Sequence, residues 1–253
     1  MTNPGRLRFL VHSGFHKTGT SSLQGFLDMH SQALSPFFYG FGRDTAPELD
    51  IAAKAYARRP FPWRLLAFRK KLHAQLELLP KDQNVVLSME SLSGLMPGHK
   101  TFGGGMARDY STTAIPMARV LLDEIRQVLG QDTEIIFLLT TREKDDWLRS
   151  VHGHLLRSIR MTDDLDAFQA KFADLPSLPD QVNSIARSLK GIRVEQAALE
   201  DYTLARTGPA RAVLDLMEVP NALRKMLEPT PRANLQAGPH LRVGSVLASY
   251  AKH

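Results

Sequence analysis

Short apolar runs alternate along the chain with longer segments in which apolar residues recur at helical spacing. Helical periodicity covers 20–29, 64–79, 115–129 and 143–160, and runs of strand length stand at 7–11, 37–41, 84–88, 134–140 and 192–194. Short buried strands separated by long helices are typical of parallel βαβ units. The pattern therefore predicts an α/β fold with a central, mostly parallel sheet flanked by helices.

The segment 96–113 interrupts this alternation. It contains three consecutive glycines, Gly103 to Gly105, which favour a mobile loop over a boundary between domains. No stretch rich in proline, glycine and serine divides the chain elsewhere. We therefore expect residues 1–253 to form a single domain, which this length permits.

Composition excludes several classes of protein. The 253 residues are 43% hydrophobic, which supports a core and excludes a disordered chain. The absence of cysteine excludes disulfides, thiolate metal sites and cysteine nucleophiles. The apolar run 9–11 is too short for a signal peptide, and none approaches the ~18 apolar residues of a membrane-spanning helix. We expect a soluble, cytoplasmic protein without a membrane span.

The segment 14–23 follows the first predicted strand and opens the first predicted helix. At such a junction the unpaired N–H groups of the helix and its dipole attract an anion. Gly19 allows close approach of the backbone, Lys17 adds a positive charge, and hydroxyl groups come from Thr18, Thr20, Ser21 and Ser22. Together they predict a cradle for a phosphate-like group, although each residue alone also suits an ordinary capped turn.

The order of residues in this loop differs from the Walker A pattern, because Lys17 precedes Gly19 instead of following the second glycine. The string Gly-Phe-His-Lys-Thr-Gly-Thr-Ser-Ser-Leu-Gln resembles the 5′-phosphosulfate loop of sulfotransferases that use PAPS (3′-phosphoadenosine 5′-phosphosulfate), and bacterial, carbohydrate-type members in particular. The resemblance implies a P-loop-like three-layer domain. It also implies that Lys17 contacts the phosphosulfate, while residues 18–22 cradle the 5′-phosphate.

A second match to this family follows the run 134–140. The family places an arginine at the end of a strand and a serine eight residues later, and both hold the 3′-phosphate. Arg142 and Ser150 have this spacing and context, and the planar guanidinium group grips phosphate oxygens in pairs. Lys144 stands where the family often has proline, so we expect the helix start to differ slightly. Arg232 is the candidate for the basic segment that closes over the nucleotide in family members.

Sulfuryl transfer requires a base for the acceptor proton and a cation for the leaving bridging oxygen. Lys17 suits the second task. Glu90 follows the run 84–88, and parallel sheets bind ligands at the carboxyl ends of their strands. The resemblance to carbohydrate-type enzymes likewise implies Glu90 as the base; a helix cap or surface position is the alternative. His16 titrates near neutrality and is the competing catalytic candidate. No His/Asp/Glu spacing predicts a metal cage, and the family mechanism implies no required metal.

We expect the segment between the first loop and Glu90 to contribute to binding of the acceptor. Residues 37–68 hold eight of the 19 aromatic residues, and residues 51–76 hold seven lysines and arginines without any carboxylate. These seven charges account for the whole net charge of +6. Such a segment suits a small-molecule or glycan acceptor, with an anionic glycan as one candidate. A core helix with a solvated basic face explains it equally well. No helix-turn-helix, zinc or RNP pattern indicates nucleic acid.

The sequence therefore predicts a PAPS-dependent sulfotransferase that transfers a sulfuryl group from PAPS to a hydroxyl or amine of an unidentified acceptor. A P-loop nucleotide kinase or NTPase, with 84–90 as its Walker B strand, is one alternative. A non-catalytic PAP-binding or anion-binding module is the other. The acceptor and the oligomeric state are left open by the sequence.

Overall fold

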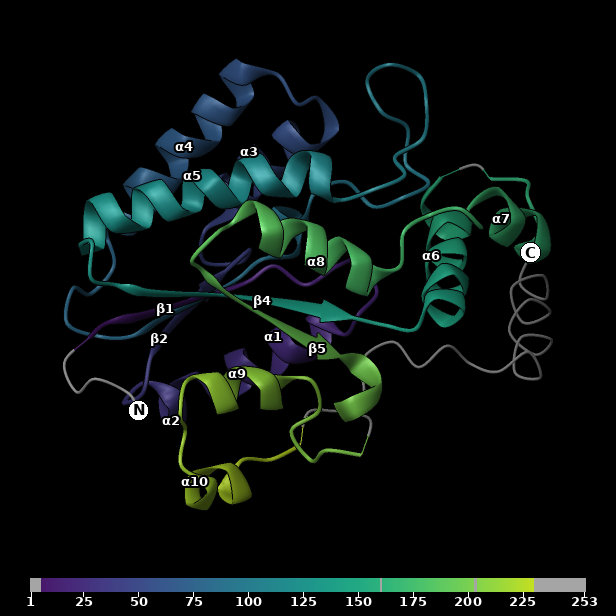
Figure 1. Ribbon diagram of the computed structural model, residues 1–253. Helices are drawn as coiled ribbons and strands as arrows, with labels where there is room; N and C mark the ends of the chain where they lie inside the picture. The colour runs from purple at the N-terminus through teal and green to yellow at the C-terminus, as the bar shows by residue number, and fades with distance from the viewer. Residues whose placement is uncertain (1–5, 160, 203, 230–253) are drawn as a thin grey trace, which may run out of the picture.

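Five parallel strands form the centre of the molecule (Figure 1). The computed structural model describes residues 6–159, 161–202 and 204–229. In these residues the strands are paired in the order β2-β3-β1-β4-β5, and each pair is parallel. Their bounds are β1 Arg8–His12, β2 Tyr39–Gly42, β3 Val85–Ser88, β4 Glu134–Thr141 and β5 Arg193–Ala198. The predicted α/β class with a parallel sheet is confirmed.

Helices cover both faces of this sheet and make the fold three-layered (Figure 1). One layer contains α3 Pro47–Arg58, α4 Pro62–Glu77, α5 Ser111–Leu129 and α8 Leu178–Ser188. The opposite layer contains α1 Thr20–Met29, α2 Ser31–Leu34, α9 Ala210–Leu216 and α10 Asn221–Met226. Helices α6 Lys144–Ser158 and α7 Leu165–Lys171 lie beyond the end of β4, and two 3₁₀ turns span Glu90–Ser93 (η1) and Leu199–Tyr202 (η2).

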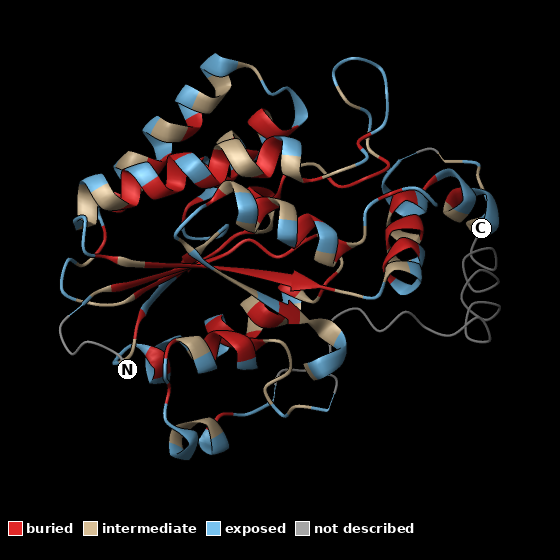
Figure 2. Cartoon of the chain, viewed as in Figure 1, coloured by how far each residue is buried: buried red, intermediate tan, exposed pale blue. Residues whose placement is uncertain are grey.

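The strand residues point alternately into two hydrophobic cores, one on each side of the sheet. Phe9 and Val11 join the core under α3, α4, α5 and α8, whereas Leu10 joins the core against α1 and α9. Figure 2 shows the central strands and the inner helix faces as buried. Strands covered on both faces read as continuous apolar runs, which is why the sequence pattern located β1, β3 and β4.

Several elements differ from the predicted ones: the helices α2, α3, α7, α8, α9 and α10 lie outside the predicted helical segments, and α5 starts earlier than predicted. Helix α3, Pro47–Arg58, was not predicted, and it is the helix that carries part of the basic segment. Helix α5 begins at Ser111, four residues before the predicted start at 115, and it contains Pro116 in its interior. The side chain of Asp109 accepts a hydrogen bond from the Thr112 N–H at 2.8 Å and so supports the earlier start.

Strand register brings three loops together at one edge of the sheet. His12 stands opposite Ser88 of β3 and Leu138 of β4. The Met89 N–H donates to the His12 carbonyl at 3.0 Å, and the Ser13 N–H donates to the Leu138 carbonyl at 3.1 Å. The loops that follow β1, β3 and β4 therefore begin side by side. Among the described residues, no helix is long and apolar enough to cross a membrane.

Candidate active site

The loop between β1 and α1 has an unusual backbone. Lys17 and Gly19 have φ values of 69° and 93°. Left-handed backbone is uncommon for a residue with a Cβ and often marks a functional site. At Gly19 a Cβ would also lie 2.8 Å from Cδ1 of Leu199 in η2. Glycine at position 19 is thus required both by the turn and by packing against η2.

The amino end of α1 faces this loop without a capping side chain. Gly19 is the N-cap residue, and the first turn carries no acidic residue. The Leu23 N–H is bonded to the Gly19 carbonyl at 3.1 Å. The preceding N–H groups of Thr20, Ser21 and Ser22 are the ones that a helix leaves without an intrahelical acceptor. This arrangement favours an anion, as predicted for a phosphate cradle.

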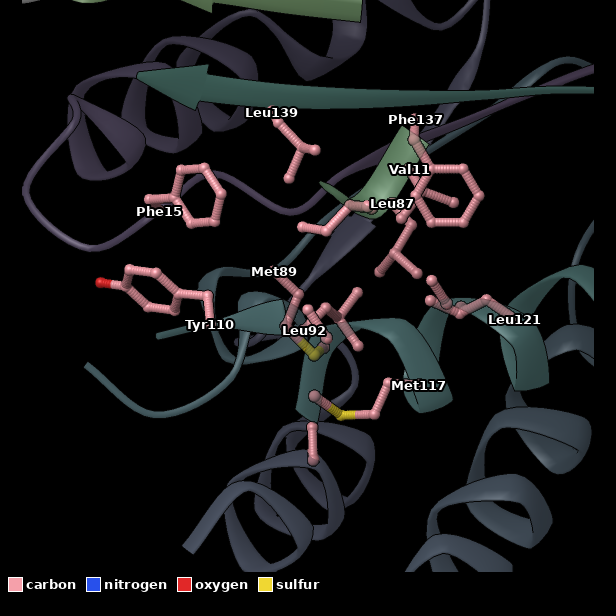
Figure 3. Packing of buried hydrophobic residues seen from close by; sticks show 14 of the residues in the cluster. Val11, Phe15, Leu87, Met89, Leu92, Tyr110, Met117, Leu121, Phe137 and Leu139 are labelled. Carbon is pink, nitrogen blue, oxygen red and sulfur yellow. The ribbon is translucent and has the colours of Figure 1, made fainter. Parts of the chain in front are cut away.

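Several side chains anchor the loop from the protein side. The Thr18 hydroxyl donates to the Phe15 carbonyl at 2.6 Å and lies 2.7 Å from the Thr140 hydroxyl of β4. The ring of Phe15 lies 4.7 Å from that of Tyr110 (Figure 3). Because the Thr18 side chain is buried and hydrogen-bonded in this way, its contribution to a ligand would come from its backbone N–H. Its hydroxyl group is used in the hydrogen bonds that hold the loop in place.

The second motif begins where β4 ends. Arg142 follows Thr141, and α6 starts at Lys144 after Glu143, whose carboxylate accepts from the N–H groups of Asp145 and Asp146 at 2.8 and 3.1 Å. Lys144 occupies the first helical position, which also favours proline. Its Nζ donates to two carbonyl groups at 2.7 Å each, those of Ala173 and Leu175. Helix α6 therefore starts at Lys144.

The structure brings the two motifs into contact through Trp147, which lies between Arg142 and Ser150 in the sequence. The Trp147 Nε1–H donates to the His16 carbonyl at 2.9 Å, and the indole is fully buried. Arg142 and Ser150 are half-buried, and neither has a hydrogen-bond or ion-pair partner within the described part of the chain. The guanidinium group of Arg142 and the hydroxyl of Ser150 are thus left without a side-chain partner among the described residues, while Trp147 between them in the sequence contacts the first loop.

The three predicted catalytic side chains gather at the ends of β1 and β3. Glu90 is the first residue of η1, and its Oε2 lies 3.8 Å from Nε2 of His16. Burial raises the pKa of the Glu90 carboxyl, while the positive charge of Lys17 opposes that rise. Burial lowers the pKa of the Lys17 ammonium, with Glu90 raising it and Arg157 lowering it further. Lys17 and Glu90 are therefore electrostatically coupled.

His16 is held as a neutral imidazole. Its ring stacks on Tyr110 with 5.8 Å between centroids and 11° between planes, and its Nδ1 is buried without a partner among the described residues. Burial, with help from His99, Lys17 and Lys54, lowers the pKa of His16 to about 3. An imidazole with so low a pKa is a weak proton acceptor at neutral pH, and this favours Glu90 as the base.

His99 and His154 were not among the predicted site residues, yet they join this cluster. Their rings lie 6.5 Å apart in an edge-to-face arrangement. Burial lowers the pKa of both, assisted by Arg58 at His99 and by Lys17 at His154. The sequence held one signal for His154. It follows Ser150 by four positions and so lies on the same face of α6.

The basic segment is compensated by carboxylates from outside it. Arg69 binds Glu124 at 2.5 Å, Lys54 binds Asp50 at 2.5 Å, and Lys71 pairs with Glu48. Four of the eight aromatic residues are buried in the hydrophobic cores, namely Phe38, Phe41, Tyr56 and Phe68. Much of the segment is therefore an ordinary helical surface over a core. Arg232 lies outside the described residues.

No protein-family model matches the chain. DNA mismatch repair protein MutS of Chlorobium chlorochromatii is 25% identical over 170 residues, which are 66% of this chain and 19% of that protein. MutS of Chlorobium phaeobacteroides is 25% identical over 163 residues, 62% of this chain and 18% of that protein. The chain thus spans about a fifth of the length of these curated relatives.

Two solved structures are similar to the chain at low identity. A sulfotransferase from Alicyclobacillus acidocaldarius has a TM-score of 0.45 and 16% identity, covering 90% of both chains. Kti12 from Chaetomium thermophilum, in complex with ADP-AlF3, has a TM-score of 0.40 and 15% identity, covering 83% of this chain and 97% of the other. These similarities do not assign the chain to a family, so its function is argued from the site.

Proposed function

We propose that this protein is a PAPS-dependent sulfotransferase, which transfers a sulfuryl group from PAPS to a hydroxyl or amine of an acceptor. The observation that carries the proposal is the meeting of two phosphate-binding motifs at adjacent strands. The β1–α1 loop and the start of α6 are joined by the hydrogen bond from Trp147 to the His16 carbonyl. Glu90 reaches the same place from β3, with Oε2 3.8 Å from His16 Nε2.

The groups left without partners match the anionic ends of PAPS. The uncapped amino end of α1 and Lys17 suit the 5′-phosphosulfate, with Ser21 and Ser22 adding hydroxyl donors. Arg142 follows the adjacent strand β4, Ser150 lies in helix α6, and both suit the 3′-phosphate.

In the proposed reaction the acceptor oxygen attacks sulfur in line with the bond to the bridging phosphate oxygen. The new S–O bond forms as the bridging bond breaks, and its electron pair leaves on the phosphate of PAP. Glu90 takes the proton of the acceptor hydroxyl, a role for which a carboxylate with a raised pKa is suited. Lys17 stabilises the negative charge that develops on the leaving phosphate oxygen.

Isothermal titration with PAP tests nucleotide binding by the intact protein. We expect Lys17→Ala and Arg142→Ala each to weaken PAP binding by roughly tenfold or more, because each removes a charge-assisted contact to phosphate. Arg187→Ala is the matched control, since Arg187 is an exposed arginine at the end of α8. Absence of PAP binding, or variants that bind as tightly as the wild type, would overturn the proposal.

The same titrations separate the alternatives. Tighter binding of ATP with magnesium than of PAP would identify a P-loop kinase or NTPase. Turnover is measured with radiolabelled PAPS and the extract of the producing organism as the source of acceptors. A protein that binds PAP and transfers no sulfate to any component would be a non-catalytic binding module.

A further inference from the structure

A cavity of about 150 Å³ lies between the first loop, η1 and α3, and it opens beside Glu90. Its lining includes His16, Glu90, Arg43, Lys54, Arg58 and His99. Pockets for drug-sized ligands usually measure roughly 300–1,000 Å³. A cavity of this size suits one terminal unit of a ligand, whose remainder would leave through the mouth.

Two buried hydroxyl groups in the cavity wall lack hydrogen-bond partners. They are Oγ of Ser91 and Oγ1 of Thr20, and their residues are only 5% and 3% exposed. Buried polar groups are almost always hydrogen-bonded in folded proteins. Among the described residues five buried side-chain atoms lack such a partner, and three of them, Nδ1 of His16 included, belong to residues that line this cavity. They therefore point to a polar ligand there.

The charges around the cavity differ in how they are compensated. Lys54 is bound to Asp50 at 2.5 Å, and Arg43 is bound to Asp44 at 3.1 Å. Arg58, one helical turn after Lys54 on α3, has no acidic partner among the residues that the structure describes. Its charge reaches into the cavity, where it contributes to the lowered pKa of His99. An anionic group of the ligand would find its counter-charge at Arg58.

An aromatic cluster of Phe61, Trp63 and Phe102 packs next to Arg59, the residue that follows Arg58 in the chain. The guanidinium group of Arg59 lies 5.3 Å from the Phe102 ring centroid, and Phe61 stacks on Trp63 at 4.5 Å while meeting Phe102 edge-on at 5.0 Å. Phe102 comes from the loop that projects beyond α3, α4 and α5 (Figure 1). Trp63 and Phe102 are 64% and 60% exposed. Exposed ring faces beside cations suit the apolar face of a sugar.

We propose that this cavity and the aromatic cluster beside Arg59 form the acceptor site for an acidic saccharide. The inference rests on the proposed sulfotransferase function. One sugar of the acceptor occupies the cavity with a hydroxyl at Glu90. A carboxylate or sulfate of the saccharide binds Arg58, and the next unit lies on Phe102 and Trp63. Arg58 thus sets the preference for an anionic acceptor.

Titration of the PAP-loaded protein with matched saccharides tests this assignment. The probes are oligosaccharides of hyaluronan, heparosan and polygalacturonate, each beside its carboxyl-reduced form. We expect at least one acidic saccharide to bind roughly tenfold more tightly than its reduced form, because a hydrogen bond to a charged group is lost on reduction. Binding by none of the acidic saccharides, or equal binding of both forms, would overturn the proposal.

Single substitutions test whether Arg58 and Phe102 cause the preference for the acidic saccharide. Arg58→Ala should reduce binding of the acidic saccharide to that of its reduced form, and Phe102→Ala should weaken both forms alike. Lys70→Ala, an exposed cation on α4, is the control and should bind like the wild type. An Arg58→Ala variant with unchanged preference would also overturn the proposal.

Titration of the protein with PAP alone distinguishes failure of the proposed sulfotransferase function from failure of the proposed acceptor site. Wild-type protein that binds PAP without binding any acidic saccharide contradicts only the acceptor site. Wild-type protein that fails to bind PAP, yet binds an acidic saccharide through Arg58, contradicts only the sulfotransferase function. Arg58→Ala should leave PAP affinity unchanged in either case.

Discussion

Glu90 and His16 lie 3.8 Å apart, and burial favours the neutral form of each. For His16 this means an imidazole with a pKa of about 3, which is neutral and weakly basic at pH 7. For Glu90 it means a carboxyl whose pKa is raised while Lys17 still favours ionisation. At the scale of single residues, these directions favour Glu90 over His16 as the proposed base.

Glu90→Gln should lower turnover of PAPS by roughly 10²–10⁴-fold, the usual contribution of a general base. In the wild type, kcat/KM should fall as the pH drops through the pKa of Glu90, which burial raises above the ordinary value of a glutamate, because only the carboxylate accepts a proton. Steady-state rates from pH 4 to 8 check this. PAP titration of the variant is the control and should be unchanged. An acidic limb that persists in the variant would assign the base elsewhere.

The same substitution should stabilise the fold. Because folding raises the pKa of Glu90, the ionised carboxylate is disfavoured in the native state, and stability is lost as the pH rises through that pKa. Thermal melts should therefore show a higher Tm for Glu90→Gln than for the wild type at pH 7. Near pH 3, where the wild-type carboxyl is also neutral, the two melts should converge. A lower Tm for the variant at pH 7 would contradict this account.

Among the elements, the β1–α1 loop is the one whose geometry depends most on its neighbours. Its left-handed residues, its uncapped helix start and the hydrogen bond from Trp147 together hold it against β4 and α6. Gly19 makes this dependence explicit, since a Cβ there would lie 2.8 Å from Leu199. The loop is therefore positioned by η2 and α6, which follow it in the chain by more than a hundred residues.

Gly19→Ala should destabilise the protein by about 1–3 kcal/mol, because it adds left-handed strain and a clash with Leu199. Gly104→Ala is the matched control. Its φ is also positive at 84°, but nothing lies within 4 Å of the added Cβ. Urea unfolding of both variants separates the two causes. Equal losses of unfolding free energy would mean that packing against Leu199 contributes nothing.

The elements also show which parts of the fold the sequence could predict. The run 20–29 matches α1 at both ends, and 134–140 falls one residue short of β4. Both elements bury apolar residues at regular spacing, and this spacing can be seen in the local sequence. Helix α3 was not predicted because its buried face consists of Leu49, Asp50, Ala53, Tyr56 and Ala57, in which an aspartate and two alanines weaken the apolar pattern. The cavity beside it was unpredictable, since its walls come from four segments that only tertiary packing brings together.

The shared location of the candidate site residues was predictable for a different reason. Lys17, Arg142 and Glu90 follow three separate strands, and the carboxyl ends of parallel strands share one edge of a sheet. Burial and pairing were not predictable. The sequence does not reveal that Glu124 and Glu48 bind Arg69 and Lys71 of the basic segment. It also does not reveal that the Thr18 hydroxyl is occupied within the protein.

For the whole molecule, buried histidines should make stability depend on pH. His12, on the central strand, is fully buried, its Nδ1 lies 2.8 Å from the Ser88 hydroxyl, and burial lowers its pKa to about 4. The unfolded chain binds a proton near pH 6.5, so stability is complete above that pH and is lost as the pH falls towards 4.

Urea unfolding should show a loss of about 3 kcal/mol from His12 alone between pH 7 and pH 4, from a shift of roughly 2.5 pKa units. The loss should be larger in total because His16 titrates in the same direction. His12→Gln should flatten the dependence, since a glutamine takes up no proton in this range. A wild-type stability that stays constant from pH 7 to pH 4 would contradict the neutral, buried state of His12.

The central claim is that the β1–α1 loop and the start of α6 bind one nucleotide, with Arg142 at its 3′-phosphate. Titration of wild-type protein and Arg142→Ala with PAP and with adenosine 5′-phosphate tests it most directly, because the two nucleotides differ only in that phosphate. We predict that wild-type protein binds PAP roughly tenfold or more tightly than adenosine 5′-phosphate, and that Arg142→Ala removes this preference without weakening adenosine 5′-phosphate. Equal affinity of wild-type protein for both nucleotides, or a preference that survives in Arg142→Ala, would contradict the account.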